Sequence, residues 1–400
     1  MRTWRKGTLV GLSLMTMAGV VAGCGSTTSS NSTSGGTPAN SSSSNSTGSQ
    51  SSSNSKLVPL KQITIGYSVS TLTNQFFVGL TAGVKREAKA LGVNLIFDNA
   101  EGNPGTQTNQ VEELVSRKVN AIILNPIDAH GIIPAVQQAN AAGIPVITLD
   151  RTAEGGTIDS FVRNSSKVMS EQAAQWIADQ LKARYGSYKG NVVDLEGLMS
   201  TSPGQARQQG FVTVMKKYPN IHVIATLPGN FDQQTSYNDM LDVIRGHSGT
   251  KIDAVFNGND DNAVGAERAI QQQGLFKPIG SPDHILIASM DGTAQALAAI
   301  KSGQQDMTVS QNPLKEAEAA VQIAVEKIEG KSIPSNVHWP SMMLTPKNIN
   351  STAAQQFGLW SLSLNDSSKG NIPNMNSLPI YNSNGSVTGS HSNLYSQISK

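Results

Sequence analysis

The sequence predicts an α/β protein with two lobes, each built on a parallel β-sheet. From Gln62 onward, short runs of β-branched apolar residues alternate with longer segments whose apolar residues recur at helical spacing. The alternation repeats about every 25 to 30 residues, which is typical of parallel strands joined by helices that cover both faces of a sheet. Because this region holds roughly 285 residues, more than a single hydrophobic core usually contains, we expect two lobes.

The expected strands are short and apolar. They lie at 63–69, 93–97, 121–124, 144–149, 192–195, 223–227, 252–256, 285–288 and 307–309. The segments between them with helical spacing include 77–90, 110–118, 170–184, 205–217, 261–273 and 314–329. Gly or Pro follows many of these segments, as expected where a helix ends.

The first 23 residues have the organisation of an export signal. Arg2, Arg5 and Lys6 precede an uncharged apolar stretch that ends in small residues before Cys24, the only cysteine of the chain. The stretch is short and Gly-rich, whereas a membrane span needs about 20 apolar residues. The segment resembles a bacterial lipoprotein signal, which implies cleavage after residue 23, a lipid on Cys24 and an extracytoplasmic protein anchored to the cell membrane. The alternative is an inert thiol in a plain secretory leader.

Segments rich in Ser and Asn border the α/β region on both sides. Residues 24–60 contain few apolar side chains to bury, so they predict a flexible tether. Residues 348–400 form a similar C-terminal extension, in which Leu359, Trp360 and Leu362 are candidates to pack back on a lobe. Much of the extension from Ser361 onward is expected to be poorly ordered.

The charge of the chain argues against nucleic acid as a partner. The formal net charge is +2. Residues 1–23 contain three positive charges and no negative ones, so their removal leaves a formal charge of −1. No cluster of Lys and Arg is present, although phosphate binding needs several cations on one face.

Polar and aromatic side chains follow nearly every predicted strand. In parallel sheets, ligands bind outside the carboxyl ends of the strands. The candidates there are amides, carboxylates, guanidinium groups and aromatic rings: Ser70, Asn74, Phe76, Phe77, Asn125, Asp150, Arg151, Arg207, Phe231, Asn259, Asp291 and Gln311. Sugar hydroxyls both donate and accept hydrogen bonds, and the C–H faces of a sugar ring are apolar. The set therefore indicates a carbohydrate site.

Each member of this set also has a structural explanation. An Asp, Asn or Thr after a strand is most often a helix N-cap, and this is the preferred interpretation for Asp232, Asp261 and Thr293. One of Phe76 and Phe77 can belong to the core. The two arginines can pair with surface carboxylates. These residue types are concentrated at strand ends, however, and this concentration favours a binding site.

Several motifs resemble the ribose-binding proteins of the periplasmic sugar-binding family. They are 70–77 (STLTNQFF), Asn125-Pro126, 144–151 (IPVITLDR), Asn259-Asp260, Asp291-Gly292-Thr293 and Gln311, in family order over about residues 61–345. The resemblance implies the type I periplasmic-binding-protein fold, with two Rossmann-like lobes joined by crossovers near residues 164, 311 and 337. It places 61–164 with 312–337 in the N-terminal lobe, and 165–311 with 338–347 in the C-terminal lobe. It also implies sugar contacts from the twelve candidate residues, with Gln311 at a hinge.

Two positions depart from the family pattern. Gln75 stands where ribose binders often have Pro, and Met290 stands where they have an aromatic residue. Because Met is softer and less flat than an aromatic ring, we expect the pocket wall to be reshaped there.

Two other classes of protein, an enzyme and a transcription regulator, are alternatives to a sugar receptor. An anchored glycosidase could use the carboxylates Asp150 and Asp291, but neighbouring arginines are expected to lower their pKa values and remove the general acid. No metal-ligand spacing or catalytic motif involves the six histidines. A transcription regulator of this fold would carry a DNA-binding module where this chain has an export signal.

The sequence therefore predicts a non-enzymatic receptor without cofactor or metal. We expect a monomer that captures a monosaccharide and passes it to the membrane permease of an ABC importer. A ribose-like pentose is the first candidate ligand, and allose, xylose, inositol or another polyol are alternatives. A chemosensory or signalling role of the same receptor stays open.

Overall fold

A computed structural model of the chain describes residues 58–358, 360–364, 379–381 and 387–390. The predicted signal peptide at 1–23, the lipidation site Cys24 and the tether up to residue 57 lie outside the described residues. So do Leu359 and most of the C-terminal extension beyond Leu364. None of the helices in the described part is long and apolar enough to cross a membrane.

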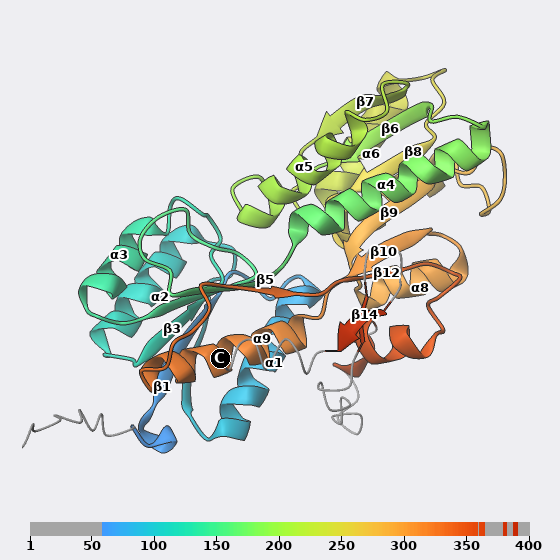
Figure 1. Cartoon of the computed structure of the whole chain (residues 1–400). Helices are drawn as coiled ribbons and strands as arrows, with labels where there is room; N and C mark the ends of the chain where they lie inside the picture. The colour runs from blue at the N-terminus through green and yellow to red at the C-terminus, as the bar shows by residue number, and fades with distance from the viewer. Residues whose placement is uncertain (1–57, 359, 365–378, 382–386, 391–400) are drawn as a thin grey trace, which may run out of the picture. The chain divides into compact units, whose positions relative to one another are not determined.

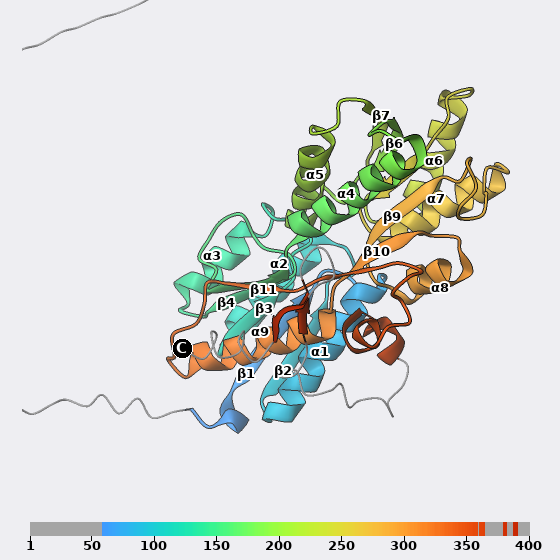
Figure 2. The same cartoon turned by 45° about the vertical axis from the view of Figure 1, so that its right-hand side comes forward.

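The first lobe is built on a six-stranded sheet in the order β11-β5-β4-β3-β1-β2. Its strands are all parallel: β1 (Thr64–Val69), β2 (Asn94–Asn99), β3 (Ala121–Leu124), β4 (Val146–Leu149), β5 (Ser160–Asn164) and β11 (Asn336–Trp339). Its helices are η1 (Leu60–Gln62), α1 (Gln75–Leu91), α2 (Pro104–Ser116), α3 (Ile133–Ala141) and α9 (Pro313–Ile328). Helices α1 and α9 lie side by side although more than two hundred residues separate them (Figures 1 and 2).

The second lobe repeats this plan with the order β12-β10-β9-β8-β6-β7. Its strands are β6 (Gly190–Leu195), β7 (Ile221–Leu227), β8 (Ala254–Asn257), β9 (Leu286–Asp291), β10 (Met307–Ser310) and β12 (Met342–Leu344). Its helices are α4 (Ser166–Tyr185), α5 (Ser202–Met215), α6 (Gln233–Gly246), α7 (Asp260–Gln272) and α8 (Ala294–Ser302). Only the edge strand β12 of this sheet runs antiparallel, against β10.

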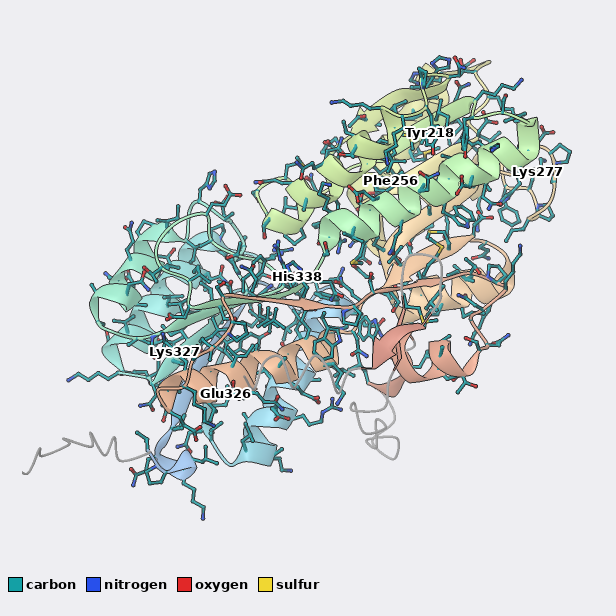
Figure 3. The ribbon with its side chains drawn as sticks, viewed as in Figure 1. Tyr218, Phe256, Lys277, Glu326, Lys327 and His338 are labelled. Atoms are coloured by element: carbon teal, nitrogen blue, oxygen red, sulfur yellow. The ribbon has the colours of Figure 1, made fainter. Side chains whose placement is uncertain are left out.

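Each sheet carries hydrophobic core on both faces. Along β3, Ile123 packs in the core beneath α1 and α9, whereas its neighbour Ile122 packs in the core beneath α2 and α3. Successive side chains of a strand point to opposite faces, so a strand buried on both sides is apolar throughout. In the second lobe, Phe256 of β8 packs against Phe211 of α5 with ring centroids 4.4 Å apart (Figure 3). The predicted fold class, two parallel sheets covered on both faces, is confirmed.

The chain passes between the lobes three times. It crosses after β5, between β10 and α9, and between β11 and β12. The first crossing follows residue 164 and the second lies at residues 311 and 312. The third lies later than predicted, because β11 pairs with β5 up to the partners Trp339 and Asn164. The assignment of His338 and Trp339 to the second lobe was therefore wrong.

The C-terminal extension starts with two short helical turns, η2 (Ala354–Gly358) and η3 (Trp360–Ser363). Trp360 is buried, as proposed for a residue that packs back on the fold, whereas Leu362 is exposed. Further along, β13 (Pro379–Tyr381) and β14 (Val387–Ser390) pair antiparallel with each other.

Candidate functional site

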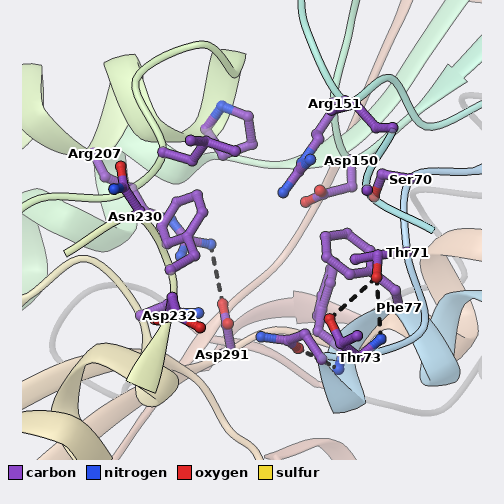
Figure 4. A pocket seen from close by; sticks show the side chains of 18 of the residues that line it. Ser70, Thr71, Thr73, Phe77, Asp150, Arg151, Arg207, Asn230, Asp232 and Asp291 are labelled. Carbon is purple, nitrogen blue, oxygen red and sulfur yellow. Dashed lines mark hydrogen bonds and ion pairs between the residues drawn. The ribbon is translucent and has the colours of Figure 1, made fainter. Parts of the chain in front are cut away.

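A cavity of about 310 Å³ lies where the carboxyl ends of strands from both sheets meet (Figure 4). It is lined by Ser70, Thr71, Thr73, Asn74, Phe76, Phe77, Glu101, Gly102, Ile127, Asp150, Arg151, Leu198, Pro203, Arg207, Asn230, Phe231, Asp232, Asn259, Asp291 and Gln311. All the candidate site residues except Asn125 are among them. The structure therefore brings together side chains that are separated by more than two hundred residues in the sequence.

The first lobe contributes the ends of β1 and β4. Asn74 caps α1 by accepting a hydrogen bond from the Phe76 amide at 2.7 Å, which sets both phenylalanines at the start of the helix. The Arg151 guanidinium lies over the Phe77 ring, 4.8 Å from its centroid. Asp150 has a φ of 62°, a backbone conformation that is uncommon outside Gly, Asn and Asp.

The second lobe contributes the same three kinds of side chain: a guanidinium group, a carboxylate and a phenylalanine ring. Arg207 of α5 donates from Nη2 to Asp291 Oδ1 at 3.0 Å and from Nη1 to the Gly258 carbonyl at 2.7 Å. Its guanidinium lies 5.3 Å from the centroid of the Phe231 ring. Gln311, between β10 and α9, donates to the same Asp291 oxygen at 2.7 Å.

Both lobes thus present a carboxylate, a guanidinium group and a phenylalanine to one cavity. Three buried polar atoms of the cavity lining, Arg151 Nε, Arg207 Nε and Gln311 Oε1, have no hydrogen-bond partner among the described residues. Buried polar groups are normally paired, so these atoms are available to a polar ligand. A ligand with several hydroxyl groups and apolar faces has the complementary chemistry.

Burial has the largest effect on the pKa values of the two carboxyl groups in the cavity, Asp150 and Asp291. It raises the pKa of Asp291 to about 7, against the opposing charge of Arg207. Burial also raises the pKa of Asp150, against Arg151 and Arg207. The arginines lower these pKa values as expected, but the expectation that they remove the general acid was wrong, because desolvation of each carboxylate outweighs the neighbouring cations and the net shift is upward. The carboxyl pKa values therefore do not exclude a general acid.

Asn125 lies behind the cavity wall. Its Oδ1 accepts from Ser70 Oγ at 2.7 Å, and its Nδ2 donates to the Leu149 carbonyl at 2.8 Å. It is fully buried and joins the ends of β1 and β4, so the geometry gives it a supporting position rather than the expected direct contact.

Met290 also lies away from the cavity. It is fully buried in the core of the second lobe with Met307 and Val309. Because strand side chains alternate, the residue before Asp291 points to the opposite face of the sheet. The expectation that Met290 reshapes the pocket wall was wrong.

The cap interpretations hold for two of three residues. Asp232 accepts from the Thr235 amide, and Thr293 accepts from the Ala296 amide, so both are N-caps. Asp261 is not a cap, since Asn259 caps α7. The Asp261 carboxylate instead accepts hydrogen bonds from Asn74 of the first lobe and from Gln233.

Sequence reasoning missed several lining residues. Glu101 and Gly102 follow β2, where the same rule of searching strand ends would have found them. Asn230 precedes the predicted Phe231 in one loop, and both residues have positive φ angles. The apolar lining residues Ile127, Leu198 and Pro203 gave no chemical signal in the sequence. Among the described residues, no group of three or more His, Cys, Asp or Glu side chains is arranged to hold a metal ion.

A family model described as periplasmic binding protein domain matches residues 65–332. The chain belongs to this family. The ribose import binding protein of Bacillus subtilis (strain 168) is 35% identical to it over 288 residues, which are 72% of this chain and 88% of the relative. The ribose import binding protein of Escherichia coli (strain K12) is 32% identical over 270 residues, which are 68% of this chain and 86% of the relative.

Solved structures of periplasmic binding proteins share the fold. A solute binding protein of an ABC transporter from Bacillus halodurans C-125, with bound myo-inositol, has a TM-score of 0.66 at 29% identity. The match covers 74% of this chain and 98% of that protein. A solute binding protein from Actinobacillus succinogenes 130z with bound D-allose has a TM-score of 0.64 at 27% identity, and the match covers 72% and 98% of the two chains. Both are solute binding proteins of ABC transporters.

Proposed function

We propose that this protein captures a monosaccharide outside the cytoplasm and passes it to the permease of an ABC importer. The observation that carries the proposal is the paired set of carboxylate, guanidinium and phenylalanine that the two lobes present to one cavity. Charged groups in such a set bind hydroxyls with short, strong hydrogen bonds, while the rings cover the C–H faces of the sugar.

The first candidate ligand is a ribose-like pentose. Support comes from the Asp150-Arg151 pair and Gln311 in the cavity and from ribose import binding proteins among the relatives. Allose, xylose, inositol and other polyols are the alternatives. Relatives include a xylitol-binding protein of Mycolicibacterium smegmatis, and solved structures hold myo-inositol and D-allose.

We assign the sugar contacts to the cavity residues of both lobes. From the first lobe these are Ser70, Asn74, Phe76, Phe77, Asp150 and Arg151, and from the second Arg207, Phe231, Asn259 and Asp291, with Gln311 at a crossing. A ligand that bridges both lobes stabilises the arrangement in which they approach each other, whereas a ligand held by one lobe would not. Binding is therefore coupled to closure about the three crossings.

Residues 1–23 and Cys24 supply the proposed location. Cleavage before Cys24 and lipid attachment would hold the protein at the outer face of the cell membrane. Mass spectrometry of the membrane-extracted protein tests this, with the Cys24→Ala variant as control. An unmodified cysteine would contradict the anchor.

The ligand is tested by a thermal-shift screen over pentoses, hexoses and polyols, followed by calorimetry on the hits. We expect the largest rise in melting temperature with D-ribose. Absence of binding to every sugar and polyol would contradict the proposed function. Release of a product from simple glycosides would favour a glycosidase instead, and copurification with a sensor rather than a permease would favour signalling.

A further inference from the structure

The C-terminal extension contacts the back of the candidate site. Trp360 lies outside the 65–332 segment that matches the family model, yet its side chain is only 3% exposed. It belongs to the same hydrophobic core cluster as Phe76 and Leu80 of α1 and Leu297 of α8. This cluster joins side chains of both lobes.

In the second lobe, Trp360 forms a hydrogen bond with the backbone of Asp291, a residue that lines the cavity. Its Nε1 donates to the Asp291 carbonyl at 3.0 Å, and the same carbonyl accepts from the Gln311 amide at 3.2 Å. Asp291 has a φ of 128°, a conformation that L-residues rarely adopt and that persists only when the surroundings hold it. The carboxylate of Asp291, which faces the cavity, is aimed by this backbone.

Neighbouring hydrogen bonds fix the extension at the same point. Ser361 Oγ donates to the Gly292 carbonyl at 3.0 Å, and Ser310 Oγ donates to the Gly358 carbonyl at 2.7 Å. Gly292 has a positive φ, and a Cβ there would lie 2.1 Å from Ser310 Oγ. The residue after β9 therefore lies directly against the end of β10, and hydrogen bonds join both to the extension.

On the side of the first lobe, Trp360 packs on α1. Its ring meets Phe76 edge-on, with centroids 6.3 Å apart and planes at 87°. At Gly79, one turn further along α1, a Cβ would lie 2.8 Å from the indole ring, so the absence of a side chain there makes room for Trp360. Phe76 and Asp291 both line the cavity, one from each lobe.

We propose that Trp360 is a positioning residue of the ligand site, which holds Phe76 of one lobe and the Asp291 backbone of the other in their binding geometry. The C-terminal extension is then a part of the binding device. This inference rests on the proposed function for its consequence on affinity, but the positioning itself is a property of the free protein.

The test compares the full-length protein with Trp360→Phe, which keeps a ring and removes the N–H donor, and with Ser361→Ala. Trp176→Phe on α4 is the matched control, because it lies partly exposed in the second lobe and lines no part of the cavity. Calorimetry with D-ribose, and with myo-inositol if D-ribose does not bind, measures affinity. We expect about tenfold weaker binding for Trp360→Phe, about threefold weaker for Ser361→Ala and no change for Trp176→Phe.

Hydrogen–deuterium exchange of the sugar-free proteins measures the positioning directly. We expect faster exchange in 74–80 and 288–294 in Trp360→Phe, and in 288–294 in Ser361→Ala, with 205–215 unchanged in both. Unchanged exchange in these segments would overturn the inference, and so would wild-type affinity in Trp360→Phe. If the wild-type protein binds no sugar, the proposed function fails. The exchange result still decides whether Trp360 positions Phe76 and the Asp291 backbone. If Trp360→Phe does not fold, the affinity and the hydrogen–deuterium exchange of Ser361→Ala test the inference instead.

Discussion

Arg207 and Asp291 form a buried ion pair in the second lobe, with 3.0 Å between Nη2 and Oδ1 (Figure 4). Their side chains are 4% and 5% exposed. Eighty-four residues separate them in the sequence. The pair fixes two cavity-lining groups relative to each other, and it leaves Arg207 Nε without a partner among the described residues.

Replacement of Arg207 by Ala should abolish most measurable sugar binding, measured by calorimetry. Removal of one partner leaves the Asp291 carboxylate buried and unpaired, which costs about 3 to 5 kcal/mol in stability. Arg207→Lys keeps the positive charge but loses the planar guanidinium group, which donates hydrogen bonds from several nitrogens. We therefore expect at least tenfold weaker binding with a smaller loss of stability. The control is Arg245→Ala, whose exposed ion pair on α6 contributes little. Affinity near that of wild type in Arg207→Ala would count against the assigned site.

Asp150 is best tested with Asn, which tolerates its positive φ and keeps a hydrogen-bond acceptor. We expect Asp150→Asn to fold and to bind at least tenfold more weakly, because the carboxylate is the stronger acceptor. Asp150→Ala should lose most measurable binding. If Asp150→Asn retained the affinity of the control Asp242→Asn, the role of the carboxylate would be refuted.

Ser70 and Asn125 should act as a unit. Asn125 supports the Ser70 hydroxyl from behind, so loss of either removes the same arrangement. We expect Asn125→Ala to reduce stability by about 1 to 3 kcal/mol and to weaken binding. In a double-mutant cycle, the effects of Ser70→Ala and Asn125→Ala on affinity should be smaller together than their sum. Additive effects would indicate two separate roles.

Gln75 links the lobes through its side chain. Its Oε1 accepts from the Ala294 amide at the start of α8, at 2.8 Å. We expect Gln75→Ala and Gln75→Pro to weaken binding about fivefold, since both remove a bond between the lobes. Gln75 is the first residue of α1, where Pro is well tolerated, so the Pro variant should melt no lower than the Ala variant. Unchanged affinity in both variants would show that this link does not influence binding.

Asp194 should make the protein less stable as the pH rises. Burial raises its pKa to about 7 in the folded state. The folded protein therefore binds a proton that the unfolded chain releases near pH 4, and the free energy of unfolding falls between about pH 4 and pH 7. Asp194→Asn should be more stable than wild type at pH 8, by about 2 to 4 kcal/mol, and equal to it near pH 4. Denaturant unfolding at both values measures this, with exposed Asp242→Asn as control; a pH-independent difference would contradict it.

The alternation of strands and helices was predictable from the sequence because it depends on local periodicity. Strand runs such as Ile122 and Ile123 are apolar throughout, and this pattern alone predicts burial on both faces. The candidate site was predictable for a related reason. The carboxyl ends of parallel strands share one edge of the sheet, so polar residues at those ends gather there whatever the rest of the fold.

Other features depend on contacts between distant segments. Asn125 directly follows β3, and Met290 is the last residue but one of β9. Hydrogen bonding to Ser70 and the alternation of side chains along β9 place both side chains away from the cavity. Trp360 is an isolated aromatic residue in a polar tail, and no local pattern predicts that it reaches Asp291.

By itself, the sequence determined the two-lobed α/β class and the set of polar and aromatic residues at the strand ends, since both follow from local patterns and from the geometry of parallel sheets. Only the tertiary structure decided that Arg207 pairs with Asp291 and that burial raises the carboxyl pKa values more than the arginines lower them. It also decided that Trp360 contacts Phe76 and the Asp291 backbone. Pairing, desolvation and packing depend on which distant segments meet, and that is a property of the folded chain.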